Sequence, residues 1–588
     1  MTNHKTIEGV YGPGSYTDVT FIPVPQDCER VLKWVASTTP GFAKEPTLLK
    51  EVVFHGDDFP HIPGPLKPGV LSAVISAVAG ITAREICKLK GFDTGPVSID
   101  TDQAALFPAS ASLMSIGGKT GFEMAEDGSL WKLGTDLDKA ALTKNPMHYR
   151  SWAFYQTKEV LPTYVYVMGS LDPASYLKAF GLDSEAPVKS NDEAYALLIP
   201  RLLPFSYRLT HDSYNLQKTV FSSYSAPEFE LKCLELGVCG QTGHSPAAWR
   251  ETLMGKRLAA HPLLNYKRVI EVPDLPPVPF PTTSDKRALA GIKIIEFSRV
   301  IAAPALGAVL TSFGAEVIKI NSPYLPDPNA LQITLTAGKS TQSADLNNPQ
   351  DVERVRKLVE EADVVVQGFR KGAIERKGFG LNDVLAMANK RGKGIVYLDL
   401  SCYGPDGTYA ERPGYQQIAD AASGASYLCG SAYGFPAGTS VLPSLPIADM
   451  VAGLTGACEV LMALRDRAVH GGSYHCNTVL TSVDTIQCEK EFGLYSPEIV
   501  KRTQEKYNFA PMTPDLHVED LLVGVLKAWA KGGLLENQAH YQRFDDSPFG
   551  KDHVILAPLV HFEDKQADPY WSHSPVPYLY NGEEGWAQ

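Results

Sequence analysis

The segment after residue 291 alternates between short, β-branched apolar runs and helical stretches, and this alternation limits the fold more than any other feature. Such alternation is typical of parallel sheets, in which a helix returns the chain to the start of the next strand. The sequence therefore predicts an α/β fold with a Rossmann-like parallel sheet. We expect strands at 292–297, 316–320, 363–366 and 395–400, and helices at 305–313, 349–362 and 381–389.

A proline-rich segment separates this region from the first half of the chain. Residues 271–281 contain five prolines, which neither a helix nor a sheet accommodates. We therefore interpret 271–287 as a linker. It divides the chain into a first part, 1–270, a Rossmann-like domain, 288–480, and a C-terminal segment, 481–588, that returns to the fold.

Two pairs of similar segments indicate an internal duplication. Residues 86–106 resemble 461–480, and residues 253–264 resemble 548–559 in the same order along the chain. The alternative is chance similarity between short helix–turn–strand pieces. With a duplication, the first part is a degenerate copy, and its additional segment 145–203 is a smaller α+β domain that the second copy lacks.

Charge and cysteine content exclude several classes of protein. Lys and Arg total 54 against 66 Asp and Glu, a net charge of −12 that is opposite to that of nucleic-acid-binding proteins. The nine cysteines include no CxxC pair, as expected of a reduced chain without a disulfide framework. The apolar run 69–83 is shorter than a membrane span and predicts a buried helix. We expect a cytoplasmic protein with neither a nucleic-acid nor a membrane partner.

Common cofactor and metal motifs do not fit. The turn at 298–304 after the first strand has no glycine, which disfavours dinucleotide binding. Gly338-Lys339-Ser340 resembles the end of a phosphate-binding loop, but Ile333 stands where its first glycine belongs. No HExxH or GxSxG motif is present, and the histidines are scattered, so we expect no metal site.

Three stretches of the second half resemble the family III CoA-transferases, which include formyl-CoA transferase, carnitine-CoA transferases and 2-methylacyl-CoA racemases. They are 289–305 with 313–320, then 364–380, then 401–424 followed by 445–464. Their shared order over 289–480 makes the resemblance specific. Asn145-Pro-Met-His-Tyr-Arg150 and Ser245-Pro-Ala-Ala-Trp249 resemble later parts of such proteins, so the chain resembles a divergent, duplicated member with the family fold.

The resemblance implies that the catalytic group is an aspartate at the start of a helix, and the matching residue is Asp449. Small residues follow it at Ala452, Gly453, Gly456 and Ala457, which lets this helix approach a neighbouring backbone or ligand closely. A carboxylate in the first turn also faces the positive end of the helix. The alternative is that Asp449 only caps the helix.

The resemblance also implies coenzyme A as a substrate, with no tightly bound cofactor. Its phosphates need cations near the carboxyl ends of the strands. Ser322 stands where formyl-CoA transferase has an arginine, and the glycine-rich lid of that enzyme has no clear counterpart. The candidate CoA-binding residues are Arg299, Ile301, Ala302, Lys339, Gly368, Phe369, Arg370, Arg376, Tyr403, Gly404 and Tyr415.

The activity implied is transfer of CoA between an acyl-CoA and a carboxylic acid through an aspartyl-CoA thioester on Asp449. Two alternatives remain open. A 2-methylacyl-CoA racemase needs a histidine base, and the stretch Tyr415-Gln-Gln-Ile has none. A non-catalytic acyl-CoA-binding protein is the other, since the first copy has no aspartate at its matching place, near Ser72. Family members resemble interlocked dimers, so the chain is either a homodimer or a pseudo-dimer within itself.

Overall fold

The computed structural model describes residues 4–42, 46–133, 145–169, 171–184, 215, 217–270, 274–325 and 327–586. Its largest sheet has seven strands in the order β10-β16-β15-β14-β11-β12-β13. Only β10 runs antiparallel to its neighbour, so the predicted parallel sheet is confirmed. Each of the four predicted strands is present, with its ends displaced by at most one residue. The strands are β10 (Tyr266–Arg268), β11 (Lys293–Phe297), β12 (Glu316–Asn321), β13 (Lys339–Ser343), β14 (Val364–Gln367), β15 (Val396–Ser401) and β16 (Tyr474–Val479).

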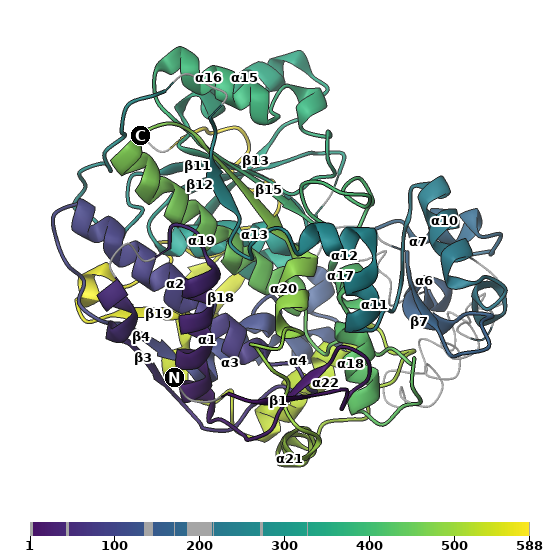
Figure 1. The fold of residues 1–588 in the computed structure, drawn as a ribbon. Coiled ribbons are helices and arrows are strands. Elements are labelled where there is room, and N and C mark those ends of the chain that lie inside the picture. The colour runs from purple at the N-terminus through teal and green to yellow at the C-terminus, as the bar shows by residue number, and fades with distance from the viewer. Residues whose placement is uncertain are drawn as a thin grey trace.

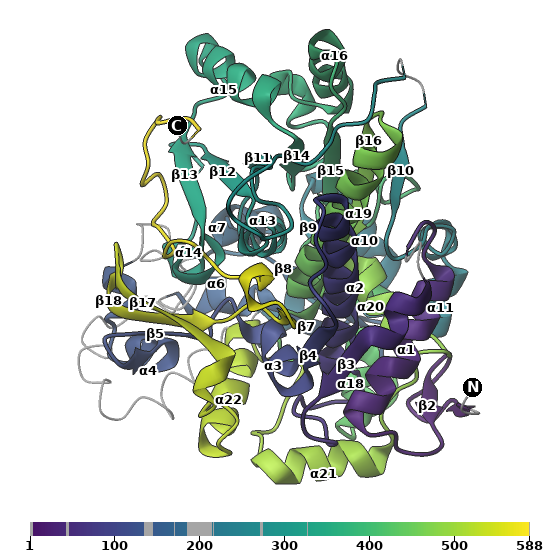
Figure 2. The ribbon, with the colours of Figure 1, turned by 90° about the vertical axis from the view of Figure 1, so that its left-hand side faces the viewer.

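Helices cover both faces of this sheet (Figures 1 and 2). α15 (Pro349–Glu361) and α16 (Leu381–Arg391) lie on one face, and α13 (Ala302–Ser312) and α19 (Ile447–His470) lie on the other. Successive strand residues point to opposite faces. Ile294 accordingly packs in the core that contains α13 and α19, whereas Ile295 packs in the core of α15 and α16.

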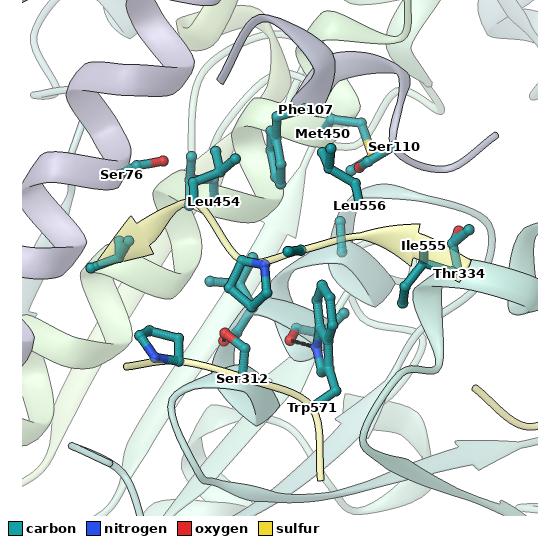
Figure 3. Close-up of a pocket in the computed structure, with 18 of the residues that line it drawn as sticks. Ser76, Phe107, Ser110, Ser312, Thr334, Met450, Leu454, Ile555, Leu556 and Trp571 are labelled. Carbon is teal, nitrogen blue, oxygen red and sulfur yellow. Dashed lines mark hydrogen bonds between the residues drawn. The ribbon is translucent and has the colours of Figure 1, made fainter. Parts of the chain in front are cut away.

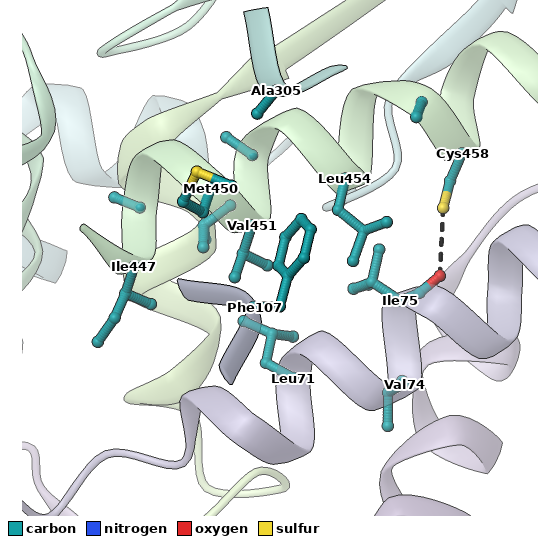
Figure 4. Close-up of a cluster of buried hydrophobic side chains, with 14 of the residues drawn as sticks. Leu71, Val74, Ile75, Phe107, Ala305, Ile447, Met450, Val451, Leu454 and Cys458 are labelled. Atoms are coloured by element: carbon teal, nitrogen blue, oxygen red, sulfur yellow. Dashed lines mark hydrogen bonds between the residues drawn. The ribbon is translucent and has the colours of Figure 1, made fainter. Parts of the chain in front are cut away.

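The long helices α19 and α2 (Pro68–Leu89) pack together at the centre of the molecule (Figure 4). Their contact is mainly apolar, but Cys458 Sγ also donates a hydrogen bond to Ile75 O over 3.3 Å. Arg465 of α19 forms an ion pair with Glu85 of α2. Both helices are long and apolar enough to cross a membrane, yet their apolar stretches are wholly buried inside the protein. The buried helix predicted at 69–83 is thus confirmed.

A three-stranded sheet in the first half repeats one edge of the seven-stranded sheet. Its order is β19-β4-β3, with β19 antiparallel and β3 parallel to β4, as β10 and β15 are to β16. The register of the strands repeats too. Val97 of β4 lies opposite both Phe562 and Val52 of its two neighbouring strands. Cys476 of β16 likewise lies opposite both Tyr266 and Leu398. These strands are β3 (Val52–His55), β4 (Val97–Asp100) and β19 (Val560–Phe562).

The helices around these sheets repeat as well. α2 precedes β4 as α19 precedes β16, and each strand leads directly into a short helix, α3 (Thr101–Leu106) or α20 (Leu480–Gln487). The chain therefore contains two copies of this unit, as the similarity of 86–106 to 461–480 predicted. The segments 253–264 and 548–559 differ in structure, because Leu253–Leu258 is helix α12 whereas its counterpart lies in a β-hairpin, but each segment leads into the antiparallel edge strand, β10 or β19.

Each half of the chain completes a sheet of the other half. β10 comes before the linker and pairs with β16, while β19 comes from the C-terminal segment and pairs with β4. A four-stranded sheet, β17-β18-β5-β6, joins the C-terminal segment to the first half in the same way. Its strands are β17 (Tyr541–Ser547), β18 (Gly550–Leu556), β5 (Met114–Ile116) and β6 (Lys119–Thr120).

A small α+β domain lies at one side of the molecule (Figure 1). Its antiparallel sheet, β7-β8-β9, has an aromatic core of its own. The domain extends beyond the predicted end at residue 203, because β9 completes this sheet; the part of the prediction at 185–203 lies outside the described residues. Its elements are α6 (Pro146–Arg150), β7 (Trp152–Gln156), β8 (Tyr164–Met168), α7 (Pro173–Ala179), α10 (Ala226–Leu236) and β9 (Cys239–Thr242).

The remaining elements connect these layers. They are β1 (Thr6–Glu8), β2 (Tyr16–Asp18), α1 (Val24–Thr38), α4 (Gly121–Glu126), α11 (Pro246–Glu251), α14 (Asn329–Leu335), α17 (Gln416–Ser423), α18 (Ala425–Ala432), α21 (Pro497–Tyr507) and α22 (Val518–Lys531).

Two glycine-to-alanine changes test the close packing of α19 on α13. A Cβ on Gly453 would lie 2.7 Å from Ala302 O and 2.9 Å from Leu306 N, both backbone atoms that cannot move aside. We expect Gly453→Ala to lower the free energy of unfolding by about 1–2 kcal/mol, because the clash outweighs the gain in helix propensity.

The control is Gly524→Ala within α22, where nothing lies within 4 Å of the added Cβ. This change should stabilise by about 0.5–1 kcal/mol. Urea unfolding of both variants measures the two effects, and a Gly453→Ala protein as stable as Gly524→Ala would contradict the packing argument.

Candidate active site

The loops after three neighbouring strands meet at the carboxyl edge of the seven-stranded sheet. β11, β14 and β15 are adjacent, and Gly368 N, just after β14, donates to Phe297 O at the end of β11 over 2.9 Å. A Cβ on Gly368 would lie 3.0 Å from Cβ of Ala303. Ligands of open α/β sheets bind at this edge. The loops after these three strands carry the predicted residues Arg299, Ile301, Ala302, Gly368, Phe369, Arg370, Tyr403 and Gly404.

The loop after β11 holds a strained residue. Val300 has a φ of 70°, a left-handed conformation that is costly for a β-branched side chain. Its backbone N donates to Asp327 Oδ1 over 2.8 Å, and Asp327 Oδ2 accepts from Lys319 Nζ over 2.5 Å. Asp327 and Lys319 are both fully buried. This pair holds the loop in one conformation at the start of α13.

Asp449 is the third residue of α19 and does not cap the helix. The N-cap is Pro446, whose side chain makes no cap hydrogen bond. Gly453, one turn further on, packs against Ala302 O, which holds the first turn of α19 against the start of α13. The residue is 8% exposed, and among the described residues nothing forms a hydrogen bond or ion pair with its carboxyl. The capping alternative is therefore wrong.

Burial raises the pKa of Asp449 from its ordinary value of 3.8 to about 7. The first-turn N–H groups and the helix dipole favour the anion, so the carboxyl remains able to ionise. A group that titrates near neutral pH and has no partner is suited to act as a nucleophile.

Two further buried carboxyls lie close to Asp449, and the sequence analysis missed them. Asp420 of α17 and Asp484 of α20 are both fully buried and close enough to repel each other as carboxylates, which favours protonation of one of the two. Gln416 Nε2 also donates to Asp420 Oδ2 over 2.6 Å. Burial raises the pKa of both, that of Asp484 to about 7, and Asp449 adds to both rises. Each is the only acidic residue of its helix, and this isolated acid was the feature of the sequence that could have identified it.

Lys339 is not a phosphate-binding residue, contrary to expectation. It begins β13, and its side chain is fully buried, with Nζ 2.8 Å from Glu296 Oε2 and 2.6 Å from Pro304 O. Burial lowers the pKa of Lys339 to about 8, although Glu296 opposes the change. A lysine enclosed in this way supports the strand and helix beneath the site and cannot reach a ligand.

Tyr403, which we expected to bind CoA, is buried in a contact with the small domain. It is buried, and its OH donates to Gln241 Oε1 of β9 over 2.5 Å, so it joins its loop to the small domain. Arg370 lies nearby on the exposed surface and donates to Gly237 O over 3.4 Å. Both contacts place the small domain beside the carboxyl edge of the sheet.

The other candidates lie nearer the surface. Arg376 is exposed on the connection between β14 and α16. Tyr415 is the N-cap of α17, four residues before the buried Ala419. Arg299 lies beside Tyr578 of the C-terminal segment. Burial raises the pKa of Tyr578 to about 12, and the nearby positive charge of Arg299 opposes this rise.

Comparisons with known proteins agree with this arrangement. The sequence profile of CoA-transferase family III matches residues 289–514. An acyl-CoA transferase of Gibberella moniliformis is 42% identical over 584 residues, covering 98% of this chain and 98% of the relative. The chain belongs to CoA-transferase family III.

Two further relatives of this CoA-transferase carry more specific names. The acetyl-coenzyme A transferase nodX of Hypoxylon pulicicidum is 28% identical and covers 88% of this chain and 85% of the relative. The succinyl-CoA–L-malate CoA-transferase beta subunit of Chloroflexus aurantiacus is 34% identical over 243 residues, which are 38% of this chain and 58% of the relative. The fold, the enzyme class and the use of acyl-CoA thus agree with the expectations from the sequence.

The raised pKa of Asp449 predicts that replacing this residue stabilises the protein at high pH. The unfolded chain ionises near 3.8 and the folded chain only near 7, so the folded state loses relative stability as pH rises between these values. At about 1.4 kcal/mol per pKa unit, the loss reaches about 4 kcal/mol above pH 7. The stabilisation by Asp449→Asn should be about 2.5 kcal/mol larger at pH 8 than at pH 5.

Urea unfolding of the wild type and the variant at both pH values measures this difference. Asp545→Asn, at an exposed position, is the control for the substitution itself. A stabilisation by Asp449→Asn that is equal at the two pH values would show that Asp449 is not titrated as its burial implies.

Proposed function

We propose that this enzyme moves CoA from an acyl-CoA to a carboxylic acid through an aspartyl-CoA thioester on Asp449. The observation that carries the proposal is the carboxyl itself: it lies in the first turn of α19, is almost fully buried, and has no hydrogen-bond or ion-pair partner among the residues that the structure describes. The resemblance of its surroundings to the family motifs, with family membership, supports the same residue.

The first half-reaction loads CoA onto the enzyme. The ionised Asp449 carboxylate attacks the acyl carbonyl, the C–S bond breaks, and CoA leaves as a thiolate with a mixed anhydride behind it. The thiolate then attacks the aspartyl carbonyl of the anhydride. This step forms the aspartyl-CoA thioester and releases the donor acid as a carboxylate.

The second half-reaction repeats these steps with the acceptor. The acceptor carboxylate attacks the aspartyl-CoA thioester, which expels the thiolate and gives a new mixed anhydride. The thiolate attacks the acceptor acyl carbon of that anhydride, and the new acyl-CoA and the free Asp449 carboxylate result. One thioester replaces another, so the cycle needs no ATP.

The surroundings of Asp449 favour the charges that develop in these steps. The N-terminal ends of α13 and α19 lie together, and their free N–H groups stabilise an oxyanion or a thiolate. Arg299, Arg370 and Arg376 are the cations that we assign to the phosphates of CoA, at the edge where the loops meet. A proton on one member of the Asp420–Asp484 pair limits the negative charge beside the nucleophile.

We propose a single active site per chain. Among the described residues, the three-stranded sheet has no counterpart of β11 or β14, and the loops after these two strands carry the arginines that we assign to CoA. α2 begins at Pro68 and has no acidic residue in its first turn, as expected for the region near Ser72. The first half thus supplies the structural partner of the catalytic half, and the chain is a pseudo-dimer within itself.

Trapping the intermediate tests these assignments. After incubation with acyl-CoA, borohydride or hydroxylamine should modify the peptide that contains Asp449, with one adduct per chain at saturation. Asp449→Asn should lower CoA exchange by at least a thousandfold, because an amide oxygen does not form the anhydride.

Asp545→Asn is the matched control and should retain wild-type exchange. Full activity in Asp449→Asn, or an adduct on another residue, would refute the assignment of the nucleophile. Tight acyl-CoA binding without exchange by the wild-type protein would instead support the non-catalytic alternative.

A further inference from the structure

The Asp449 carboxyl and the apolar cavity of Figure 3 lie on different sides of α19. Met450 and Leu454 line this cavity, Asp449 does not, and none of the described lining residues is acidic or basic. Consecutive side chains of a helix project about 100° apart, so Asp449 and Met450 face different neighbours. On the Asp449 side, α17 and α20 pack on α19. The negative charge of Asp449 therefore acts on the groups that these two helices carry.

Asp420 of α17 and Asp484 of α20 lie beside Asp449 and have few hydrogen-bond donors around them. Both are fully buried, and their helices also pack on each other. Gln416 Nε2 donates to Asp420 Oδ2 over 2.6 Å. Among the described residues, nothing donates to Asp420 Oδ1 or to either oxygen of Asp484. A buried carboxylate without donors is costly, whereas a protonated carboxyl tolerates such a place.

The titratable groups around the three carboxyls are neutral. Among the described residues, no cation opposes the rise in the pKa of Asp449 or Asp484. Arg250 of α11 donates to Cys488 O over 2.6 Å, but its ion pair is with Glu489. The groups on the surrounding elements, whose pKa values burial raises, are Tyr166 of β8, Cys239 of β9, Cys402 after β15, Cys429 of α18 and Cys488 after α20.

A negative charge on one of the three carboxyls makes ionisation of the others more difficult. Asp449 is the best place for this charge, because it alone lies in the first turn of its helix, where N–H groups stabilise an anion. Asp420 and Asp484 are each the fifth residue of their helices. Burial raises the pKa of both, and the charge of Asp449 raises it further. The ionised nucleophile thus favours protonation of the pair.

We propose that Asp420 and Asp484 are positioning residues that balance the charge of Asp449: the pair binds a proton while Asp449 is an anion and releases it to solvent when Asp449 becomes the neutral aspartyl-CoA thioester. The inference rests on the proposed function, because it needs that thioester. Loading by itself releases no proton, since the Asp449 carboxylate enters the reaction and the donor acid leaves as a carboxylate. The O–H bond that breaks belongs to the pair, which keeps the electrons as a new carboxylate. The buried compartment then holds the same net charge before and after loading.

Asp449→Asn removes the charge of the nucleophile without any substrate and tests this coupling directly. Infrared spectra distinguish the C=O stretch of a protonated carboxyl from the stretches of a carboxylate, so a titration gives the pH at which the pair ionises. The band of the pair is the one that Asp420→Asn/Asp484→Asn removes, and either single variant assigns it if the double variant does not fold. In Asp449→Asn the pair should ionise about one pH unit or more below its wild-type midpoint, because a like charge is gone.

Glu459→Gln is the matched control, since it removes another fully buried carboxyl of α19. Its oxygens accept from Asn265 N over 2.9 Å and from Thr478 Oγ1 over 2.8 Å, and burial raises the pKa of Glu459 to about 8, so it adds a band of its own. The variant should remove that band and leave the midpoint of the pair unchanged. An equal midpoint in the wild type and Asp449→Asn, or equal shifts in Asp449→Asn and Glu459→Gln, would overturn the proposal.

Proton release during loading separates this inference from the proposed function. The enzyme is mixed with acetyl-CoA, or with succinyl-CoA where acetyl-CoA forms no adduct, in weak buffer with a pH indicator, and mass spectrometry counts the adducts. At pH 8, Asp449 is about 90% ionised, so its own proton adds only about 0.1 per adduct. The wild type should release about 0.5 proton or more per adduct, and Asp420→Asn/Asp484→Asn about 0.1.

The two measurements fail in different ways. A shifted midpoint in Asp449→Asn, with no adduct from either thioester, would support the coupling of the carboxyls and refute the proposed reaction. An adduct on Asp449 that forms without proton release from the pair would refute the coupling and leave the reaction intact.

Discussion

The contact between α13 and α19 determines the position of the Asp449 carboxyl, the nucleophile that we propose. Because Gly453 has no side chain, the two helices approach until its Cα lies against the backbone of Ala302 and Leu306. Gly456 likewise leaves room for the Leu306 side chain. Because both helices begin at the carboxyl edge of the sheet, this packing brings two helix N-terminal ends to one place. A larger residue in this contact would move Asp449 relative to the loops that surround it.

Buried charges support the loop on the other side of the site. The pairs Lys319–Asp327 and Lys339–Glu296 are both fully enclosed, and Asp327 also fixes the strained backbone of Val300. A buried ion pair adds little to stability, but the loss of one partner is costly, so such pairs fix a single arrangement. Here they fix the loop that leads from β11 into α13. Their lysines belong to β12 and β13, strands without a counterpart in the described part of the first half.

The sequence predicted the central sheet well because its strands are buried on both faces and form short, β-branched runs. It missed β13 because Lys339-Ser-Thr-Gln-Ser343 is polar, as suits a strand at the edge of the sheet. It misplaced Lys339 for a related reason: a lysine after a strand looks available for a phosphate until its enclosure by Glu296 and Pro304 is known. Asp420 and Asp484 belong to separate helices, and only the folded chain brings their carboxyls together. Asp449 was predicted to be the nucleophile because the sequence around it resembles the family motifs, and not because of its position at the start of a helix.

The exchange of strands between the two halves has a kinetic consequence. Proteins assembled from two identical subunits can couple their sites, since binding at one site can change the affinity of the other site across the shared interface. In the described part of this chain, the half that faces the seven-stranded sheet has no counterpart of β11 to β14, so the site that we propose lies on one side of the interface only. With the single site that we propose, we expect substrate saturation within one molecule to be hyperbolic. We also expect residues of the first half to be free to diverge as long as they preserve β4, its pairing with β19, and the helix that packs on α19.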